Sequence, residues 1–391
     1  MEPTIDSKRA LQHLTDLLGV EGLSGQETKV AICVRAKLLR AGCRPEWIRH
    51  DSAHRRLGGD FQTGNLIVRL PGRRGESRRL LVAHLDTVPL CRGAKPQRVG
   101  DRIVARRATA LGADNRTGVA CLVTTAEAIL RGNLSHPPLT FLFTVGEEVG
   151  LRGATVVRTT DLGRPAMAFN VDSGTPAKFI VGAVGAIRWR AEIRGHAAHA
   201  GVHPEDGVSA ILIAGQAIAN LSAAGYFGKI EKGRFRGTSN VGVIRGGETT
   251  NQVTDRVMLR GECRSHDRRF LVRLARIFER TLTRTARGVR DSAGRAGEVA
   301  FESHTDYLPF RIPRSAACVT LAARAARTIG LTPEYQVSRG GQDANPLNAR
   351  GLQTVTFGAG QHGAHTLGEY VAIEEYVDGC RLALAIGTTP Y

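Results

Sequence analysis

The sequence predicts an α/β protein in which a second, smaller domain is inserted into the first. Short apolar runs typical of buried strands alternate with helical segments over the first half of the chain. Near Gly185 the pattern changes to strict alternation of apolar and charged residues, and after about residue 304 helices and apolar strands return. The 391 residues are enough for two ordinary domains. We therefore expect a first domain in two segments, 1–186 and 304–391, and an inserted domain, 187–303.

The first domain has the alternating pattern of an α/β sandwich. Its apolar runs are expected to be strands, most of them covered on both faces, at 65–70, 79–83, 139–145, 167–171, 335–337 and 353–357. The expected helices are 115–131, which ends at Gly132, and 315–329, which ends at Gly330. Ser24-Gly25-Gln26-Glu27 has the pattern of a capping box, so a further helix is expected from there to about residue 40.

The inserted domain begins with a half-exposed strand, 186–194, in which apolar and charged side chains alternate. The segments that follow are a helix at 206–221, strands at 239–244 and 256–264, an amphipathic helix at 267–289 and a strand at 298–303. The order β-α-β-β-α-β is that of the split βαβ, or ferredoxin-like, module.

The composition narrows the classes of function. Formal net charge is +18, yet only seven of the 54 basic residues are Lys, and the Arg residues are scattered without long runs or interleaved aromatics. We therefore expect no nucleic-acid partner. The seven Cys form no CxxC pair, the N-terminus has no apolar signal core, and no 18-residue apolar run exists. We expect a cytoplasmic protein with reduced thiols and no membrane segment.

Acidic and imidazole side chains follow the ends of the predicted strands or begin a helix. They are His84, Asp86, Asp114, Glu147, Glu148, Asp172 and His365. Sites in open α/β sheets form at the carboxyl ends of strands, so we expect these side chains to converge. Taken singly, each has a simpler explanation: Asp114 as a helix cap, for example, or the two adjacent glutamates as part of a solvated loop.

Convergence would bring the charges of Asp114, Glu148 and Asp172 together, and like charges that close repel one another. Divalent cations between them would reverse the sign of the interaction. Imidazole and carboxylate ligands suit zinc, with manganese or cobalt as alternatives. One carboxylate that bridges two ions is the geometry of two-metal hydrolases.

These residues resemble the motifs of the dinuclear zinc peptidases, the family that includes aminoacylase, succinyl-diaminopimelate desuccinylase, glutamate carboxypeptidase and peptidase T. The similar motifs, which extend over nearly the whole chain, are HLDTVP (84–89), LGADNRTG (111–118), GEEVG (146–150), GHAAHAG (195–201), GGQDAN (340–345) and His365-Thr366 with Glu369. The peptidase T branch is the most similar, on GECRSHD (261–267) and on Asp172. Asn115 and Arg116 depart from it, because that branch often has Asp and Lys there.

The resemblance implies a zinc-peptidase α/β sandwich and two zinc ions per chain. His84, Asp114 and Asp172 would hold one ion. Asp114, Glu148 and His365 would hold the other, with Asp114 as the bridge between them.

The resemblance also implies roles for residues that bind no metal. Glu147 would be the general base, and Asp86 would orient His84. His199, from the inserted lid domain of the same or a partner subunit, would hydrogen-bond the developing oxyanion. Arg264 and Asn240 would hold a substrate carboxylate.

The expected activity is metal-dependent hydrolysis of amide bonds in short peptides, as in a tripeptide aminopeptidase. The same constellation would also serve an N-acyl-amino-acid deacylase or a carboxypeptidase. The expected partners are a small peptide or acyl-amino-acid substrate and, through the lid domain, a second copy of the chain.

Overall fold

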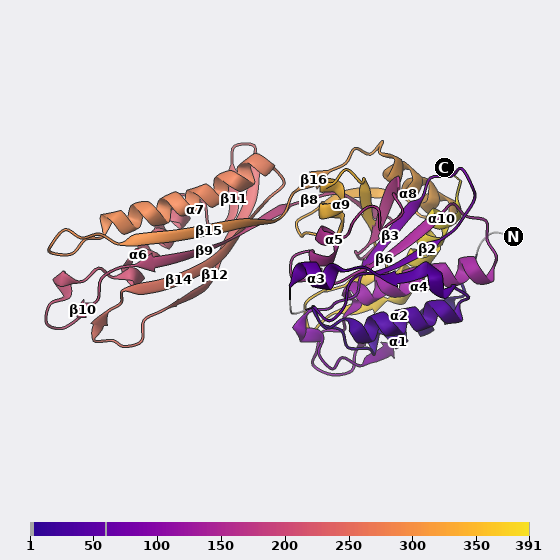
Figure 1. The fold of residues 1–391 in the computed structure, drawn as a ribbon, viewed down its shortest axis with the longest axis horizontal. Helices are drawn as coiled ribbons and strands as arrows, with labels where there is room; N and C mark the ends of the chain where they lie inside the picture. The colour runs from indigo at the N-terminus through magenta and orange to yellow at the C-terminus, as the bar shows by residue number, and fades with distance from the viewer. Residues whose placement is uncertain (1–3, 59–60, 391) are drawn as a thin grey trace. The chain divides into compact units, whose positions relative to one another are not determined.

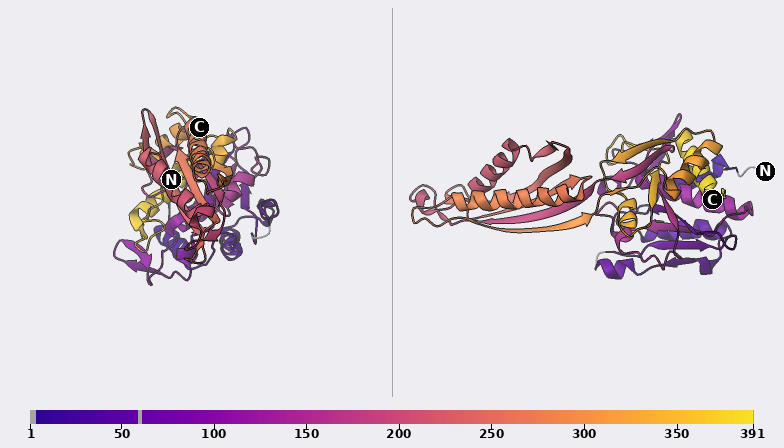
Figure 2. Two further views of the ribbon diagram at one scale, coloured as in Figure 1. Left: turned by 90° about the vertical axis from the view of Figure 1, so that its left-hand side faces the viewer. Right: turned by 90° about the horizontal axis from the view of Figure 1, so that it is seen from above.

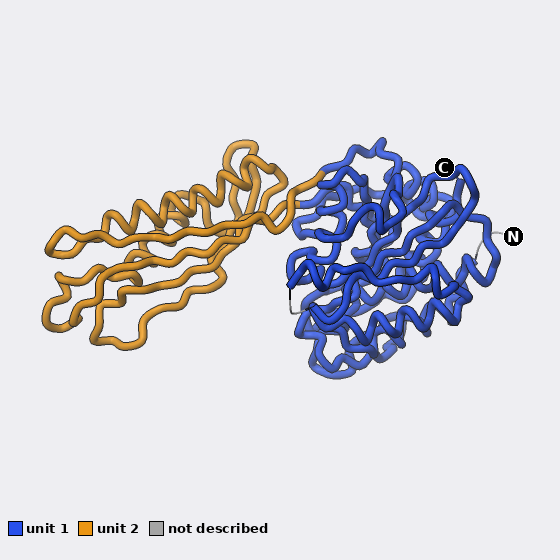
Figure 3. The backbone as a smooth tube through the Cα atoms, in the orientation of Figure 1, with its two compact units in different colours: residues 1–183, 311–391 blue, residues 184–310 orange. Residues whose placement is uncertain are grey.

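The computed structural model describes residues 4–58 and 61–390 (Figure 1). The chain divides into two compact units (Figure 3). Unit 1 comprises Met1–Ala183 and Arg311–Tyr391, and unit 2 comprises Val184–Phe310. The central sheet of unit 1 is mixed and that of unit 2 is antiparallel, and helices pack against both, so the chain is an α/β protein.

The central sheet of unit 1 has nine strands. In spatial order they are β1 (Ile48–His50), β2 (Leu66–Leu70), β6 (Leu139–Thr144), β3 (Arg79–His84), β7 (Met167–Val171), β18 (Thr354–Phe357), β8 (Lys178–Ala183) and β16 (Phe310–Arg311), with β17 (Glu334–Ser338) paired to β8. The four strands β6, β3, β7 and β18 run parallel. Their carboxyl ends therefore lie along one edge of the sheet, where sites form in α/β proteins.

Helices cover both faces of this sheet. They are α1 (Ser7–Leu18), α2 (Thr28–Arg40), α3 (Ala53–Leu57), α4 (Ala113–Arg131), α5 (Arg152–Val156), α8 (Ala317–Thr328), α9 (Ala344–Ala349) and α10 (Ile373–Thr388). On one face α4 packs on β3 and is itself covered by α1 and α10. On the other face Leu80 and Val82 of β3 belong to a buried cluster with Leu347 of α9. Burial on both faces explains why these strands are continuous apolar runs.

Two smaller sheets complete the strand pairing. One consists of β19 (Gln361–His362), β20 (Tyr370–Ala372), β5 (Arg102–Ala105) and β4 (Pro96–Val99), and the other of β10 (Ala198–His199) and β13 (Gln252–Val253). The first holds the loop that carries His365 between β19 and β20. Three 3₁₀ turns also occur in the described chain, at Pro45–Trp47, Pro89–Cys91 and Pro204–Asp206.

Unit 2 is built around a five-stranded antiparallel sheet with two helices on the same face (Figure 2) and also contains the β10–β13 pair. The strands in spatial order are β11 (Gly228–Lys232), β12 (Phe235–Gly246), β14 (Arg256–Ser265), β9 (Gly185–Arg194) and β15 (Glu298–Tyr307), and the helices are α6 (Ala210–Ala223) and α7 (Arg268–Gly288). Trp189 of β9 and Phe278 of α7 pack in the core between the two layers, with ring centroids 5.1 Å apart. The edge strand β11 was not predicted, because its sequence, GKIEK, is short and has a single buried apolar side chain.

The capping box predicted at Ser24–Glu27 is wrong. α2 begins at Thr28, and the Glu27 side chain makes no capping hydrogen bond to it. Instead, Glu27 accepts from the backbone N–H groups of Gly25 and Gly146, and the Ser24 hydroxyl donates to Asp86. A local helix pattern was thus overridden by contacts with distant segments.

Among the described helices, none combines the length and apolar character that crossing a bilayer requires.

Candidate metal centre

The parallel strands deliver most of the predicted ligands to one edge of the central sheet. His84 is the last residue of β3, Asp172 directly follows β7, and Glu148 lies four residues beyond the end of β6. Asp114 lies at the start of α4, where the Asp114–Asn115 peptide is cis, and His365 lies in the loop after β19. All five predicted ligands lie in unit 1.

These five side chains form two groups that share Asp114. In the first group His84 Nε2 lies 3.1 Å from Asp114 Oδ1 and 3.8 Å from Asp172 Oδ1. In the second, His365 Nε2 lies 2.9 Å from Glu148 Oε1 and 3.5 Å from Asp114 Oδ2. Within each group the ligand atoms lie within 4.8 Å of one another. The two oxygens of Asp114 therefore face two different sets of ligands, as a bridging carboxylate requires.

The electrostatics of the cluster favour cations. Burial and neighbouring carboxylates raise the pKa of Glu147 well above its usual range, and they raise the pKa of Asp172 as well. Burial raises the pKa of Glu148 to about 7 even though it hydrogen-bonds His365. Burial also disfavours a charged His84, but the surrounding carboxylates outweigh this and raise its pKa. The donors are two imidazoles and three carboxylates, a set that fits zinc and also manganese or cobalt.

Asp86 fixes both the ring of His84 and the backbone beyond β6. The Nδ1 atom of His84 lies 3.1 Å from the Asp86 carbonyl oxygen and 3.4 Å from Asp86 Oδ1. A proton on Nδ1 leaves the Nε2 lone pair free for a metal. The two carboxylate oxygens of Asp86 also accept from the backbone N–H groups of Glu147 and Glu148, at 3.0 and 3.1 Å.

Glu147 lies beside the ligands in a buried position, with 8% of its surface exposed. One carboxylate oxygen of Glu147, a ring nitrogen of His84 and a carboxylate oxygen of Glu148 all lie within 4.8 Å of one another. Geometry alone thus allows Glu147 either to bind a metal or to exchange protons with a water at the centre.

The other three predicted site residues, His199, Asn240 and Arg264, belong to unit 2. His199 is exposed on β10, and its Nδ1 accepts from the Gly201 N–H at 3.2 Å, so the neutral ring carries its proton on Nε2. Arg264 donates to both carboxylate oxygens of Glu262, at 2.8 and 3.1 Å. Asn240 is exposed on β12, opposite Glu262.

Sequence reasoning assigned no role to several polar residues that support the ligands. The Glu369 carboxylate accepts from the backbone N–H groups of Gly112 and Asp114, at 2.7 and 3.0 Å. Gln361 Nε2 lies 3.3 Å from Asp172 Oδ1. Asp343 is 1% exposed and accepts from the Thr144 hydroxyl. Glu369 and Asp343 belong to motifs that the sequence analysis identified, whereas Gln361 belongs to none of them.

A family model described as "Peptidase family M20/M25/M40" matches residues 80–387. The chain belongs to this family. Its members are metallopeptidases and related hydrolases, so this M20-family chain is a metal-dependent hydrolase, and the resemblance read from its motifs is confirmed.

Three relatives extend over nearly the whole of this M20-family chain. The crystal structure of the aminopeptidase PepT from Bacillus cereus is 31% identical, with a TM-score of 0.84 and 98% of each chain covered. A tripeptidase from Staphylococcus aureus is 27% identical, with a TM-score of 0.88 over 98% of each chain. The uncharacterised protein YqjE of Bacillus subtilis is 31% identical over 385 residues, again 98% of each chain.

Proposed function

We propose that the chain is a two-metal peptidase that hydrolyses the amide bonds of short peptides, in the manner of a tripeptide aminopeptidase. One observation carries this proposal: the two oxygens of Asp114 face two separate ligand groups, one with His84 and one with His365. The similarity to PepT and to a tripeptidase over almost the full length supports a peptide substrate.

In this proposal His84, Asp114 and Asp172 hold one ion, and Asp114, Glu148 and His365 hold the second. Zinc is the preferred ion, two per chain, with manganese or cobalt as alternatives. The bound ions would lower the pKa of a water and polarise the scissile carbonyl.

Glu147 is proposed as the general base. Its buried carboxylate accepts a proton from the attacking water and then delivers it to the nitrogen of the leaving amine. Asp86 is proposed to orient His84 through the Nδ1 contact.

Unit 2 is proposed to act as the lid, corresponding to the inserted domain predicted at 187–303. His199 would donate its Nε2–H to the developing oxyanion, from the same chain or from a partner subunit. Arg264 and Asn240 would bind the substrate carboxylate. Since Glu262 already occupies two donors of Arg264, this role requires the guanidinium to serve two anions at once.

We further propose a cytoplasmic enzyme that pairs with a second copy through unit 2. All seven Cys lie in the described part of the chain and are unpaired, as expected in a reducing compartment. Ile211 and Leu212 of α6 and Ile244 of β12 are large apolar side chains that are about half exposed on unit 2. We take these side chains as the candidate contacts with the second copy.

A specific observation keeps a second function open. An acetylornithine deacetylase from Myxococcus xanthus is 30% identical over 340 residues, 82% of both chains. A deacylase would use the same metal centre on an amino-blocked substrate.

A substrate panel separates the two functions. Purified enzyme loaded with zinc is assayed against free tripeptides, the same peptides with acetylated N-termini, and N-acyl-amino acids. The proposal expects a kcat/KM for free tripeptides at least about tenfold above that for their blocked forms, since loss of one charged hydrogen bond costs about 1.5–3 kcal/mol. A preference for blocked peptides or acyl-amino acids would overturn the aminopeptidase assignment and favour a deacylase.

A further inference from the structure

Side-chain oxygens hold four consecutive backbone N–H groups at the end of β6. We call residues 145–148, which carry Glu147 and Glu148, the catalytic turn. The N–H of Val145 donates to Asn65 Oδ1 at 3.1 Å, and that of Gly146 donates to Glu27 Oε1 at 3.0 Å. Those of Glu147 and Glu148 donate to the two oxygens of Asp86. The acceptors come from three separate segments of the chain.

The catalytic turn needs such acceptors because the chain leaves the sheet there. β6 ends at Thr144, so the next N–H groups have no strand partner, and leaving them buried and unpaired would be costly. Gly146 has a φ of 61°, and a Cβ at this position would lie 2.5 Å from the Phe61 ring. The backbone is therefore enclosed on one side by Phe61 and fixed on the other by side-chain oxygens.

The Glu27 carboxylate accepts from two backbone N–H groups, one in its own segment and one in the catalytic turn. Glu27 is fully buried, and its side chain makes no capping bond to α2. Oε1 accepts from Gly25 at 2.8 Å and from Gly146, whereas Oε2 is buried without a hydrogen-bond partner. A buried carboxylate with one unpartnered oxygen is unfavourable for folding. Its geometry is explained by the bond to Gly146, directly before the proposed base.

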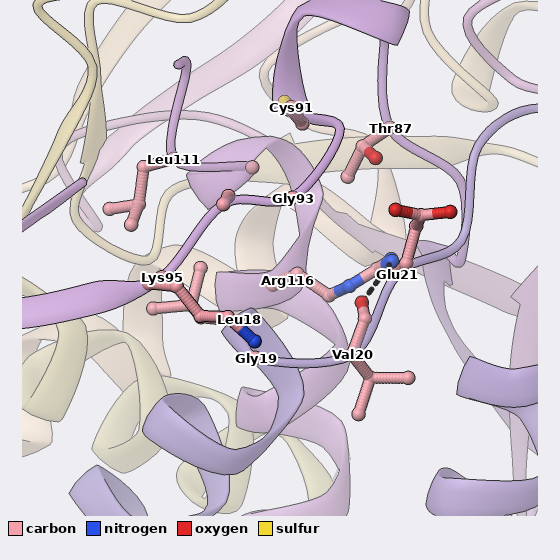
Figure 4. Close-up of a pocket in the computed structure, with 12 residues that line it drawn as sticks. Leu18, Gly19, Val20, Glu21, Thr87, Cys91, Gly93, Lys95, Leu111 and Arg116 are labelled. Carbon is pink, nitrogen blue, oxygen red and sulfur yellow. Dashed lines mark hydrogen bonds between the residues drawn. The ribbon is translucent and has the colours of Figure 1, made fainter. Parts of the chain in front are cut away.

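Arg116 supplies a buried positive charge near this carboxylate. Arg116 is 2% exposed, and its guanidinium donates to the carbonyl oxygens of Leu85, Val20 and Gly22. The bond to Val20, 3.2 Å long, is drawn in Figure 4. These bonds tie the segment that leads to Glu27 to the end of β3, and Thr87 N–H donates to Gly22 O at 3.0 Å beside them. The segment that bears Glu27 is thus anchored to the same strand end as the metal ligands.

We propose that Glu27 is a positioning residue of the active site, which holds the backbone of Gly146 so that Glu147 keeps its place beside the metal ligands. Glu27 touches neither substrate nor metal in this role. The proposal rests on the proposed function, because it takes Glu147 as the base. Burial, with Asp86 nearby, raises the pKa of Glu27 to about 7, which agrees with an acceptor that does not depend on its charge.

Two substitutions at position 27 separate hydrogen bonding from charge. Glu27→Gln keeps an oxygen acceptor of the same reach and removes the charge, so kcat is expected to stay within about threefold of wild type. Glu27→Leu removes the acceptor, and kcat is expected to fall about 100-fold, the scale on which a 1 Å misplacement of a catalytic group acts. KM should change by less than about threefold, and elemental analysis should still find the wild-type metal content.

A matched control is Glu127→Leu. Glu127 is also a buried carboxylate, and it is bound by His13 and Arg9 away from the ligands. This variant should lose thermal stability but keep wild-type kcat per folded molecule. Should Glu27→Leu fail to fold, Glu27→Asp gives the same test, since its side chain is one methylene too short for Gly146 and should lower kcat at least about tenfold.

The outcomes also separate this proposal from the proposed function. A wild-type enzyme that cleaves no amide overturns the function. An active wild type with a Glu27→Leu or Glu27→Asp variant of unchanged kcat overturns the positioning role alone. A fall in kcat as large for Glu27→Gln as for Glu27→Leu also overturns it, because the acceptor would then not be what matters.

Discussion

At the scale of single residues, Glu147 and Glu148 are adjacent carboxylates with different environments. Glu148 hydrogen-bonds His365, another predicted ligand, whereas Glu147 lies beside His84 and has a pKa that burial raises. Both residues lie in a turn rather than in an extended strand, and one carboxylate oxygen of each lies within 4.8 Å of a ring nitrogen of His84, so the two carboxylates face the same centre. The proposed division of roles rests on the hydrogen bond that Glu148 makes to His365.

The role of Glu147 can be tested by Glu147→Gln, which keeps the shape of the side chain and removes its ability to accept a proton. We expect kcat to fall by roughly 10²–10⁴, the usual contribution of a general base. Metal content, measured by elemental analysis, should be unchanged. Glu148→Gln is the matched control and should lower metal content as well as rate. A Glu147→Gln protein that loses metal would instead make Glu147 a ligand.

The bridging role of Asp114 predicts an order of metal loss. Asp114→Ala removes a ligand from both groups, whereas His365→Ala removes a ligand from one group and leaves His84, Asp114 and Asp172 intact. We therefore expect His365→Ala to retain about one ion per chain after dialysis and Asp114→Ala to retain less. Elemental analysis of both proteins at equal concentration checks this. Equal metal content in the two variants would contradict the bridge.

At the scale of elements, the sequence predicted the strands that matter most for the site. Runs such as 139–145 and 167–171 are apolar because both faces of the sheet are covered, and their ends carry the ligands. α10 was missed because Gly379 and Gly387 interrupt its helical pattern. The structure shows the reason for Gly379, where a Cβ would lie 2.8 Å from the Ala359 backbone. The need for a glycine at this position arises from a segment distant in the sequence, so the residues around Gly379 do not reveal that the helix continues through it.

Sequence-based prediction also fails where a pattern typical of a helix start serves another purpose in the folded chain. Ser24 and Glu27 have the spacing of a capping box, yet both side chains serve the region around Asp86 and Gly146. Asp343 likewise shows its buried position beside Thr144 only in the folded chain. Residues that cap a helix and residues that hold an active site in place are of the same types, so only contacts in the folded chain distinguish the two roles.

The packing of α1, α2 and α4 predicts a pH dependence of stability. His13 of α1 lies between Lys37 of α2, whose Nζ is 3.3 Å from Nδ1, and Glu127 of α4, which binds Nε2. Neutral His13 satisfies both contacts, accepting from Lys37 and donating to Glu127. Burial, together with Lys37 and Arg9, lowers the pKa of His13 despite the opposing effect of Glu127.

The sign of the effect follows from linkage. Because the pKa of His13 is lower in the folded than in the unfolded protein, its contribution to stability is complete above pH 6.5, the ordinary histidine value, and is lost as the pH falls below it. Burial opposes the ionised forms of Glu127 and Asp16, but hydrogen bonds to His13 and to Lys37, respectively, outweigh it and lower both pKa values. The stability that these two carboxylates contribute is therefore lost as the pH falls below about 4.5.

Urea denaturation between pH 7.5 and 5.5 measures this dependence. Other buried groups also titrate here, since the pKa values of Glu27 and Glu148 are raised to about 7, but they are present in both proteins. We therefore expect the free energy of unfolding of the wild type, taken relative to that of His13→Gln, to decrease as the pH falls over this range. His203→Gln, which changes an exposed histidine of unit 2, is the control and should keep the wild-type slope. An unchanged slope in His13→Gln would place the titrating group elsewhere.

At the scale of the whole molecule, the metal centre is expected to tie the stability of unit 1 to bound ions. Four predicted ligand or base carboxylates gather there, from Asp114, Glu147, Glu148 and Asp172, together with His84 and His365, so the site joins both chain segments of unit 1. Ions that bind the folded state alone stabilise it by about 2.7 kcal/mol per site when free ion is at 100 times the dissociation constant. Unit 2 contributes none of the five ligands, so its stability should not depend on the ions.

Calorimetry with and without a chelator tests this expectation. Removing both ions should lower the unfolding temperature of unit 1 by roughly 10–20 °C, given about 2.7 kcal/mol for each of two sites and 2–4 °C per kcal/mol for a domain of this size. Adding zinc back should restore it, and the transition of unit 2 should stay in place. The Asp114→Ala protein is the control, because it lacks the shared ligand and should show no shift with chelator. A shift as large in Asp114→Ala as in the wild type would mean that the ions stabilise the protein at some other place.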